Sequence, residues 1–63
     1  MKNLKWWRLQ RNMSQKQLAE ASGVSIRMIQ YYEQGVNDIN KAEAFTVYRL
    51  AKALETRMEN IME

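Results

Sequence analysis

The stretch SQKQLAEASGVSIRMIQYYEQG, residues 14–35, carries the signals that decide the fold of this 63-residue chain. Ser14 and Gln17 have the spacing of a capping box, in which each side chain binds the backbone N–H of the other residue at a helix start. Gly23 and Gly35 predict helix ends, because glycine takes a positive φ without steric cost. The stretch therefore predicts two helices joined by a short turn, over about residues 15–22 and 26–34.

Helical periodicity continues on both sides of this stretch. In the N-terminal segment, Trp6 and Leu9 lie on faces other than the one shared by Leu4, Trp7, Arg8 and Arg11. After a polar loop over residues 36–40, Asn40 and Glu43 repeat the capping pattern and predict the start of a fourth helix. The apolar spacing of that helix predicts one buried stripe, made of Val47, Leu50, Ala51 and Leu54.

Thr56 and Glu59 have the spacing of a cap and predict a last short helix. This helix is expected to turn three apolar side chains inward, Met58, Ile61 and Met62. The prediction is five helices and no strand, an all-α fold, in which residues 1–63 form a single domain without repeats or proline. At this length folding buries only about 60% of the surface of the unfolded chain. Two helices joined by a short turn with glycine have the form of a helix-turn-helix.

The chain has no cysteine and no histidine. This absence excludes disulfides, thiolate or imidazole metal sites, and catalysis by Ser-His or Cys-His pairs. Carboxylates remain as acid-base groups, but no closely spaced pair falls in an evident pocket, so we expect no enzyme, metal or cofactor. No apolar run approaches the ~18 residues of a membrane span, and a cytoplasmic protein with no membrane association is expected.

Positive charge is concentrated in the N-terminal half. Residues 1–35 hold six cations against two acids, a net charge of +4, whereas residues 36–63 hold four cations against five acids, a net charge of −1. This asymmetry favours a polyanionic partner. The alternative interpretation is a solvated basic face with no partner.

The run from Leu4 to Met62 closely resembles the Cro/C1-type helix-turn-helix regulators, also called the xenobiotic-response-element family. The matching positions are Ser14-Gln15, Leu18-Ala19-Glu20, Gly23-Val24-Ser25, Ile29, Glu33-x-Gly35 and Leu50-Ala51-Lys52-Ala53-Leu54. The resemblance implies a compact, five-helix, lambda-repressor-like DNA-binding domain with the helix-turn-helix at its second and third helices. It further implies a transcriptional regulator that binds double-stranded operator DNA as a homodimer. Since the sequence shows no second domain, we expect repression by promoter occlusion.

Helix geometry predicts which side chains of residues 26–34 face the DNA. If Ile29 lies in the core, three side chains point away from it and two flank them: Arg27, Tyr31 and Gln34, then Met28 and Gln30. A helix fits the major groove, where Arg27 can bind guanine through two parallel hydrogen bonds. The alternative for Arg27 is that it contacts a phosphate or does not contact DNA. Tyr31 either contacts bases or packs at the surface, and both glutamines are candidates for bases or phosphates.

Gln15 and Lys16 lie at the positive end of their helix, where free N–H groups can bind a phosphate. The resemblance implies that Gln15 contacts the DNA backbone and supports the start of the recognition helix. Ser25 is an N-cap that can also touch a phosphate. Ile26 departs from the family pattern and either contacts a thymine methyl or covers the core. Met28 replaces a small hydroxyl residue, which puts the family's phosphate contact there in doubt.

Arg8 lies on the apolar face of the first helix, where an unpaired guanidinium is costly. The resemblance implies a largely buried ion pair between Arg8 and Glu33; the alternative is that Arg8 reaches water. Glu55 stands where the family often has glycine, so the fourth helix either runs on or ends less sharply.

Two apolar features indicate partners other than DNA. Trp6 is expected to be partly exposed and Phe45 to lie off the buried stripe, and with the last helix they can form a dimer surface. Apolar residues near Phe45 or the C-terminus also fit the alternative function, a protein-interaction module such as an antitoxin that binds its toxin, with DNA binding secondary.

Overall fold

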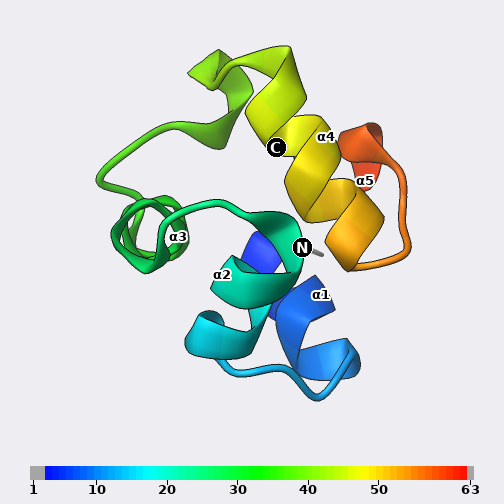
Figure 1. Ribbon diagram of the computed structural model, residues 1–63. Coiled ribbons are helices and arrows are strands. Elements are labelled where there is room, and N and C mark those ends of the chain that lie inside the picture. The colour runs from blue at the N-terminus through cyan, green and yellow to red at the C-terminus, as the bar shows by residue number, and fades with distance from the viewer. Residues whose placement is uncertain (1–2, 63) are drawn as a thin grey trace.

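The computed structural model describes residues 3–62, so Lys2 and Glu63, both included in the charge count, lie outside it. The described chain is all-helical and contains no strand, as predicted. In chain order its elements are α1 (Leu4–Gln10), α2 (Gln15–Ser22), α3 (Ile26–Gln34), the 3₁₀ helix η1 (Ile39–Lys41), α4 (Ala44–Ala53) and α5 (Met58–Ile61). Figure 1 shows α5 beside α4, with α1 and α2 below them and α3 to the left.

The boundaries of α2 and α3 are those predicted from the capping residues. Both hydrogen bonds of the capping box between Ser14 and Gln17 are present. Ser25 caps α3 by accepting a hydrogen bond from the backbone N–H of Met28. Gly23 and Gly35 end the two helices with φ values of 74° and 77°. Local signals therefore suffice to define the helix-turn-helix.

The predicted start of the fourth helix is wrong. Asn40 lies within η1, where the Asp38 carboxylate accepts its backbone N–H at 2.9 Å. This tight turn buries Ile39, which is 5% exposed, and α4 begins only at Ala44. Glu43 is at the N-cap position and makes no side-chain capping bond. A local turn that buries an apolar residue thus replaces the first helical turn that the pattern predicted.

Two alternatives were expected for the end of α4, that the helix runs on or that it ends less sharply, and the first is wrong. The helix does not run on, because Glu55 takes a left-handed φ of 56° and the chain turns back so that the N–H of Thr56 bonds Ala51 at 2.9 Å. A left-handed conformation costs a non-glycine residue about 1–2 kcal/mol. The surrounding contacts offset that cost here.

The expected cap and inward face of the last helix need correction. Arg57, not Thr56, is at the N-cap position of α5, and the Thr56 hydroxyl instead accepts a hydrogen bond from Asn60. Ile61 is fully buried and Met58 packs against the core, but Met62 is 36% exposed. Because α5 is a single turn, Met62 already falls beyond its end and turns outward.

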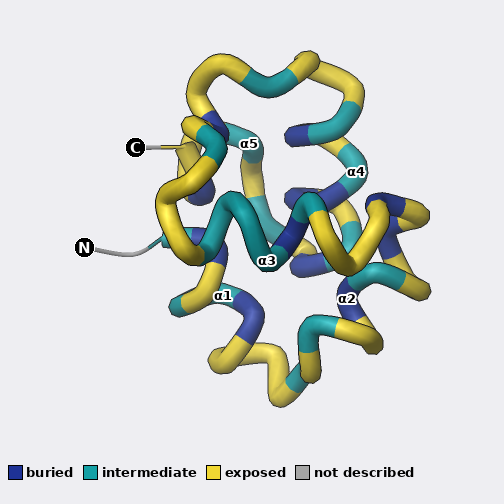
Figure 2. Tube along the Cα trace, turned by 90° about the vertical axis from the view of Figure 1, so that its left-hand side faces the viewer, coloured by how far each residue is buried: buried dark blue, intermediate teal, exposed yellow. Residues whose placement is uncertain are grey.

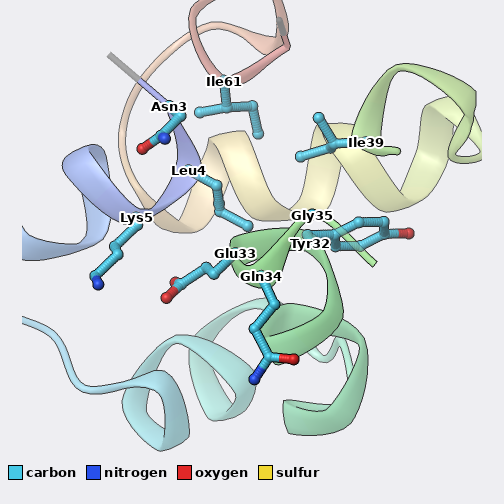
Figure 3. Close-up of a pocket in the computed structure, with 9 residues that line it drawn as sticks. All are labelled: Asn3, Leu4, Lys5, Tyr32, Glu33, Gln34, Gly35, Ile39 and Ile61. Atoms are coloured by element: carbon cyan, nitrogen blue, oxygen red, sulfur yellow. The ribbon is translucent and has the colours of Figure 1, made fainter. Parts of the chain in front are cut away.

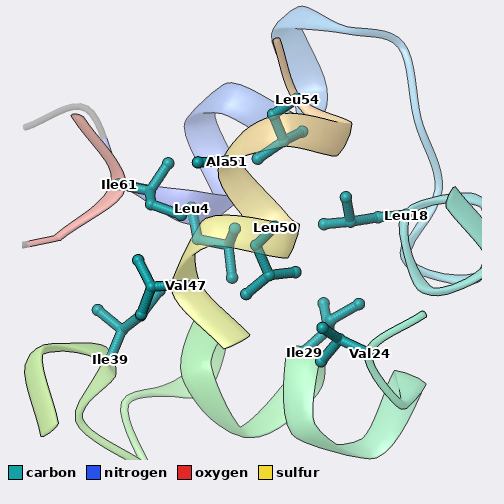
Figure 4. Close-up of a cluster of buried hydrophobic side chains, with 10 residues drawn as sticks. All are labelled: Leu4, Leu18, Val24, Ile29, Ile39, Val47, Leu50, Ala51, Leu54 and Ile61. Atoms are coloured by element: carbon teal, nitrogen blue, oxygen red, sulfur yellow. The ribbon is translucent and has the colours of Figure 1, made fainter. Parts of the chain in front are cut away.

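The core gathers ten buried apolar side chains from every helix (Figure 4): Leu4, Leu18, Val24, Ile29, Ile39, Val47, Leu50, Ala51, Leu54 and Ile61. The predicted α4 stripe is confirmed, and it supplies four of the ten. In Figure 2 the buried stretches turn toward the centre, while much of the outer surface of α2 and α3 is exposed or half-buried. Trp7 is half-buried against this core and donates its indole N–H to Asn60.

Two arginines bind the C-terminal ends of neighbouring helices. Arg49 of α4 donates to the carbonyl oxygens of Ser22 and Gly23, at 3.0 and 3.2 Å. Arg11 donates to those of Leu54 and Glu55, at 2.7 and 3.3 Å. A cation at a helix C-terminus satisfies free carbonyls and complements the helix dipole. These contacts fasten α4 to α2 and α1 to α4.

Gly23→Ala should destabilise the protein more than Gly35→Ala. Both substitutions place alanine at a positive φ, which costs about 1–2 kcal/mol. A Cβ at position 23 also displaces the guanidinium of Arg49 and so breaks its bonds to the carbonyl oxygens of Ser22 and Gly23, whereas nothing lies within 4 Å of a Cβ at position 35. Urea unfolding followed by circular dichroism measures both losses. In an Arg49→Ala background the two glycine variants should lose similar amounts, and equal losses in the wild-type background would contradict the proposed displacement.

Candidate nucleic-acid interface

The outer face of α3 carries most of the side chains predicted to contact DNA. Ile29 is the fully buried residue of this helix and sets its orientation. Arg27 and Gln34 are exposed, and Gln30 and Tyr31 are half-buried. α3 therefore presents hydrogen-bonding side chains along one outward face, as the geometry of a helix with Ile29 inside requires.

Ile26 and Met28, both in the first turn of α3, are buried to different extents. Ile26 is 41% exposed and lies outside the buried cluster, so the alternative that it covers the core is wrong. Met28 is half-buried and packs against the core, and its sulfur accepts a weak contact from the Asn37 amide at 3.9 Å. The apolar side chain of Ile26 is thus available to a partner, while that of Met28 is held largely by the protein.

Arg8 and Glu33 form the ion pair that the resemblance implies, and the pair is buried. Arg8 Nε lies 2.7 Å from Glu33 Oε2, and Arg8 Nη2 donates to Oε1 at 3.0 Å. The third nitrogen, Nη1, donates to the carbonyl oxygen of Met13 at 2.8 Å. The side chains are 10% and 4% exposed. Arg8 therefore does not reach into water; it ties α1 to α3 and to the turn before α2.

Gln15 extends this pair into α2. Its Nε2 donates to Glu33 Oε1 at 3.1 Å, and its Oε1 accepts from Gln30 Nε2 at 3.4 Å. Gln15 thus supports the middle and last turn of α3, and not its start as the resemblance implied. Ile26, at the start of that helix, has no polar side-chain group that Gln15 could bond.

Fewer cations of the N-terminal half are available to a ligand than its net charge indicates. Arg8 is neutralised by Glu33, and Arg11 is bound by backbone carbonyls. Within residues 3–62, the exposed side chains of Lys16 and Arg27 make no hydrogen bond or ion pair. Lys16 is at the N-terminal end of α2 and Arg27 at that of α3. Both charges remain free for an anionic ligand.

A small hollow of about 160 Å³ lies between the start of α1 and the end of α3 (Figure 3). The apolar side chains of Leu4, Ile39 and Ile61 line it, and Gln34 points away from them. Its carboxylate, Glu33, is already bound by Arg8. Tyr32 also lines the hollow, and burial together with the nearby Glu43 carboxylate raises the pKa of its phenol.

No cluster of three acidic side chains within residues 3–62 could hold a metal ion. The helices in that range are all too short or too polar to cross a membrane.

Arg8→Ala should lower the free energy of unfolding by about 3–5 kcal/mol, because it leaves the Glu33 carboxylate buried without its partner. That is a large share of the roughly 5–15 kcal/mol that stabilises a typical domain. Thermal and urea unfolding measure the loss. Arg57→Ala is the matched control, since this exposed side chain has no hydrogen-bond or ion-pair partner in the described chain and its loss should be small. Melting of Arg8→Ala within a few degrees of the wild type would contradict a stabilising role for the pair.

The family comparison agrees with this architecture. A helix-turn-helix family model matches residues 4–61, nearly the whole chain and the full set of helices. The searches of curated proteins and of solved structures gave no match. The five-helix arrangement is consistent with a lambda-repressor-like fold, with the helix-turn-helix at α2 and α3. The chain belongs to the helix-turn-helix family of DNA-binding transcription regulators.

Proposed function

We propose that this protein is a Cro/C1-type regulator of the xenobiotic-response-element subtype that inserts α3 into the major groove of a specific operator. The observation that carries the proposal is the outer face of α3, where exposed or half-buried polar side chains stand opposite the buried Ile29. An α-helix fits the major groove, and the N-terminal part of a recognition helix reaches the base edges. Residues 1–63 act as one domain in this proposal, at a cytoplasmic location where duplex DNA is accessible.

Base contacts are assigned to the outer side chains of α3. Arg27 binds guanine, whose O6 and N7 accept the two parallel hydrogen bonds of a guanidinium. Ile26, 41% exposed, contacts the methyl group of thymine. Tyr31 and Gln34 contact bases farther along the groove. Met28 faces the core more than the groove, so its share in the interface is limited to van der Waals contact.

Phosphate contacts are assigned to the start of α2 and to Ser25. The backbone N–H groups of Gln15 and Lys16 have no partner within residues 3–62, and they lie at the positive end of the helix dipole. Lys16 adds an exposed ammonium group. The Ser25 hydroxyl caps α3 and retains capacity for a second hydrogen bond. These contacts position the protein on DNA but carry no sequence information.

Two copies on neighbouring half-sites provide the specificity that one short helix lacks. Half-sites in helix-turn-helix operators are about 34 Å apart, one turn of DNA. The exposed rings of Phe45 and Tyr48 stack at 6.5 Å on α4, beside a hollow edged by both cations and acids, Lys52, Arg57, Glu55 and Glu59. Mixed charge permits contact between two chains that are each net positive. Occupancy of a promoter by such a dimer represses transcription by occlusion.

Selection from random duplex DNA at several salt concentrations should enrich one motif. Arg27→Ala should then lose discrimination at one base pair, worth about 1–3 kcal/mol, and leave the other positions unchanged. Lys16→Ala should weaken binding to all sequences alike and reduce the slope of log affinity against log salt by about 1. Failure to enrich any motif at moderate salt would contradict sequence-specific binding and favour the protein-interaction alternative.

Phe45→Ser should weaken the dimer without unfolding the chain, because Phe45 is 64% exposed. Native mass spectrometry of the complex with the selected duplex should show two chains for the wild type and a larger share of one-chain complexes for the variant. Val36→Ser, at another side chain of 64% exposure, is the control and should leave the mass unchanged. A wild-type complex with a single chain would contradict the dimer and leave the aromatic pair to a different protein partner.

A further inference from the structure

A series of hydrogen bonds leads from the buried ion pair to the outer part of α3. Both oxygens of Glu33 accept from Arg8, and Oε1 also accepts from Gln15 Nε2 at 3.1 Å. Gln15 Oε1 in turn accepts from Gln30 Nε2 at 3.4 Å. Three helices contribute to this series of hydrogen bonds, which ends on the half-buried Gln30.

The chemistry of Glu33 fixes the direction of every hydrogen bond in this series. An ionised carboxylate only accepts hydrogen bonds, so Gln15 must turn its NH₂ group toward Glu33. The carbonyl oxygen of Gln15 then faces Gln30, and Gln30 must turn its own NH₂ group toward Gln15. The amide of Gln30 is consequently held in one of its two orientations.

The held amide keeps one donor and one acceptor for a ligand. Gln15 uses one N–H of Gln30. The second N–H and the carbonyl oxygen of Gln30 form no other hydrogen bond within residues 3–62, so one donor and one acceptor remain. Adenine presents the complementary pair in the major groove, the N7 acceptor and the N6 donor, whereas guanine presents two acceptors, N7 and O6.

We propose that Gln30 selects adenine in the major groove and that Gln15 is its positioning residue, held in turn by the Arg8–Glu33 pair. The inference rests on the proposed function, since it assigns one base of the operator that α3 reads. It adds a role for the buried pair, which links the stability of the domain to the orientation of a reading side chain. Preorganisation of this kind lowers the entropy that Gln30 loses on binding.

Affinity for a series of duplexes tests the inference. The selected site and three variants that carry each other base pair at the assigned position are compared with the wild-type protein and with three variants, Gln30→Ala, Gln15→Met and the double variant. Gln30→Ala should reduce the preference for adenine by roughly tenfold or more. Gln15→Met keeps the length of the side chain without its amide. It should remove much of the same preference, and the double variant should lose little more than Gln30→Ala alone.

Lys16→Ala is the matched control, because a lost phosphate contact lowers affinity for all four duplexes by the same factor. Thermal unfolding of each variant confirms that the folded protein is compared. The inference is overturned if Gln30→Ala leaves every base preference intact, or if Gln15→Met lowers affinity for all four duplexes equally. Absence of any selected motif is a different result, which rejects the proposed function itself.

Discussion

The buried pair of Arg8 and Glu33 is the interaction on which the arrangement of the helix-turn-helix depends. Three nitrogens of the guanidinium are satisfied by the carboxylate and by the Met13 carbonyl oxygen. Burial of such a pair gains little net free energy, but the loss of one partner is costly, because the other charge is left in the interior. The pair therefore enforces one relative position of α1, α3 and the turn before α2. Through Gln15, it also reaches the surface proposed to read DNA.

Arginine serves two separate purposes in this small domain. Arg8, Arg11 and Arg49 make structural contacts with a carboxylate or with backbone carbonyls. Arg27 is exposed and unpaired within the described residues. A core of ten apolar side chains is modest, and arginine bonds to helix ends satisfy polar groups that packing leaves free. Net charge alone thus overstates the charge available to DNA, and the position of each cation decides its use.

Local sequence signals predicted some boundaries well and others poorly. Ser14, Gln17 and the two glycines act within one helical turn, so their effect does not depend on the rest of the fold. The pattern at Asn40 has the same form but failed, because Asp38 binds its N–H and Ile39 is buried in the core. A capping pattern specifies a helix start only when tertiary packing does not favour a competing turn.

The sequence by itself determined the all-helical class, the limits of α2 and α3 and, by resemblance, the partner of Arg8. These features follow from hydrogen bonds within one turn, from a repeat of 3.6 residues, or from a shared family pattern. Only the tertiary structure decided the bonds of Gln15 to Gln30 and Glu33, and those of Arg11 and Arg49 to distant helix ends. Such contacts join residues far apart in the chain, and their geometry exists only after the helices have packed.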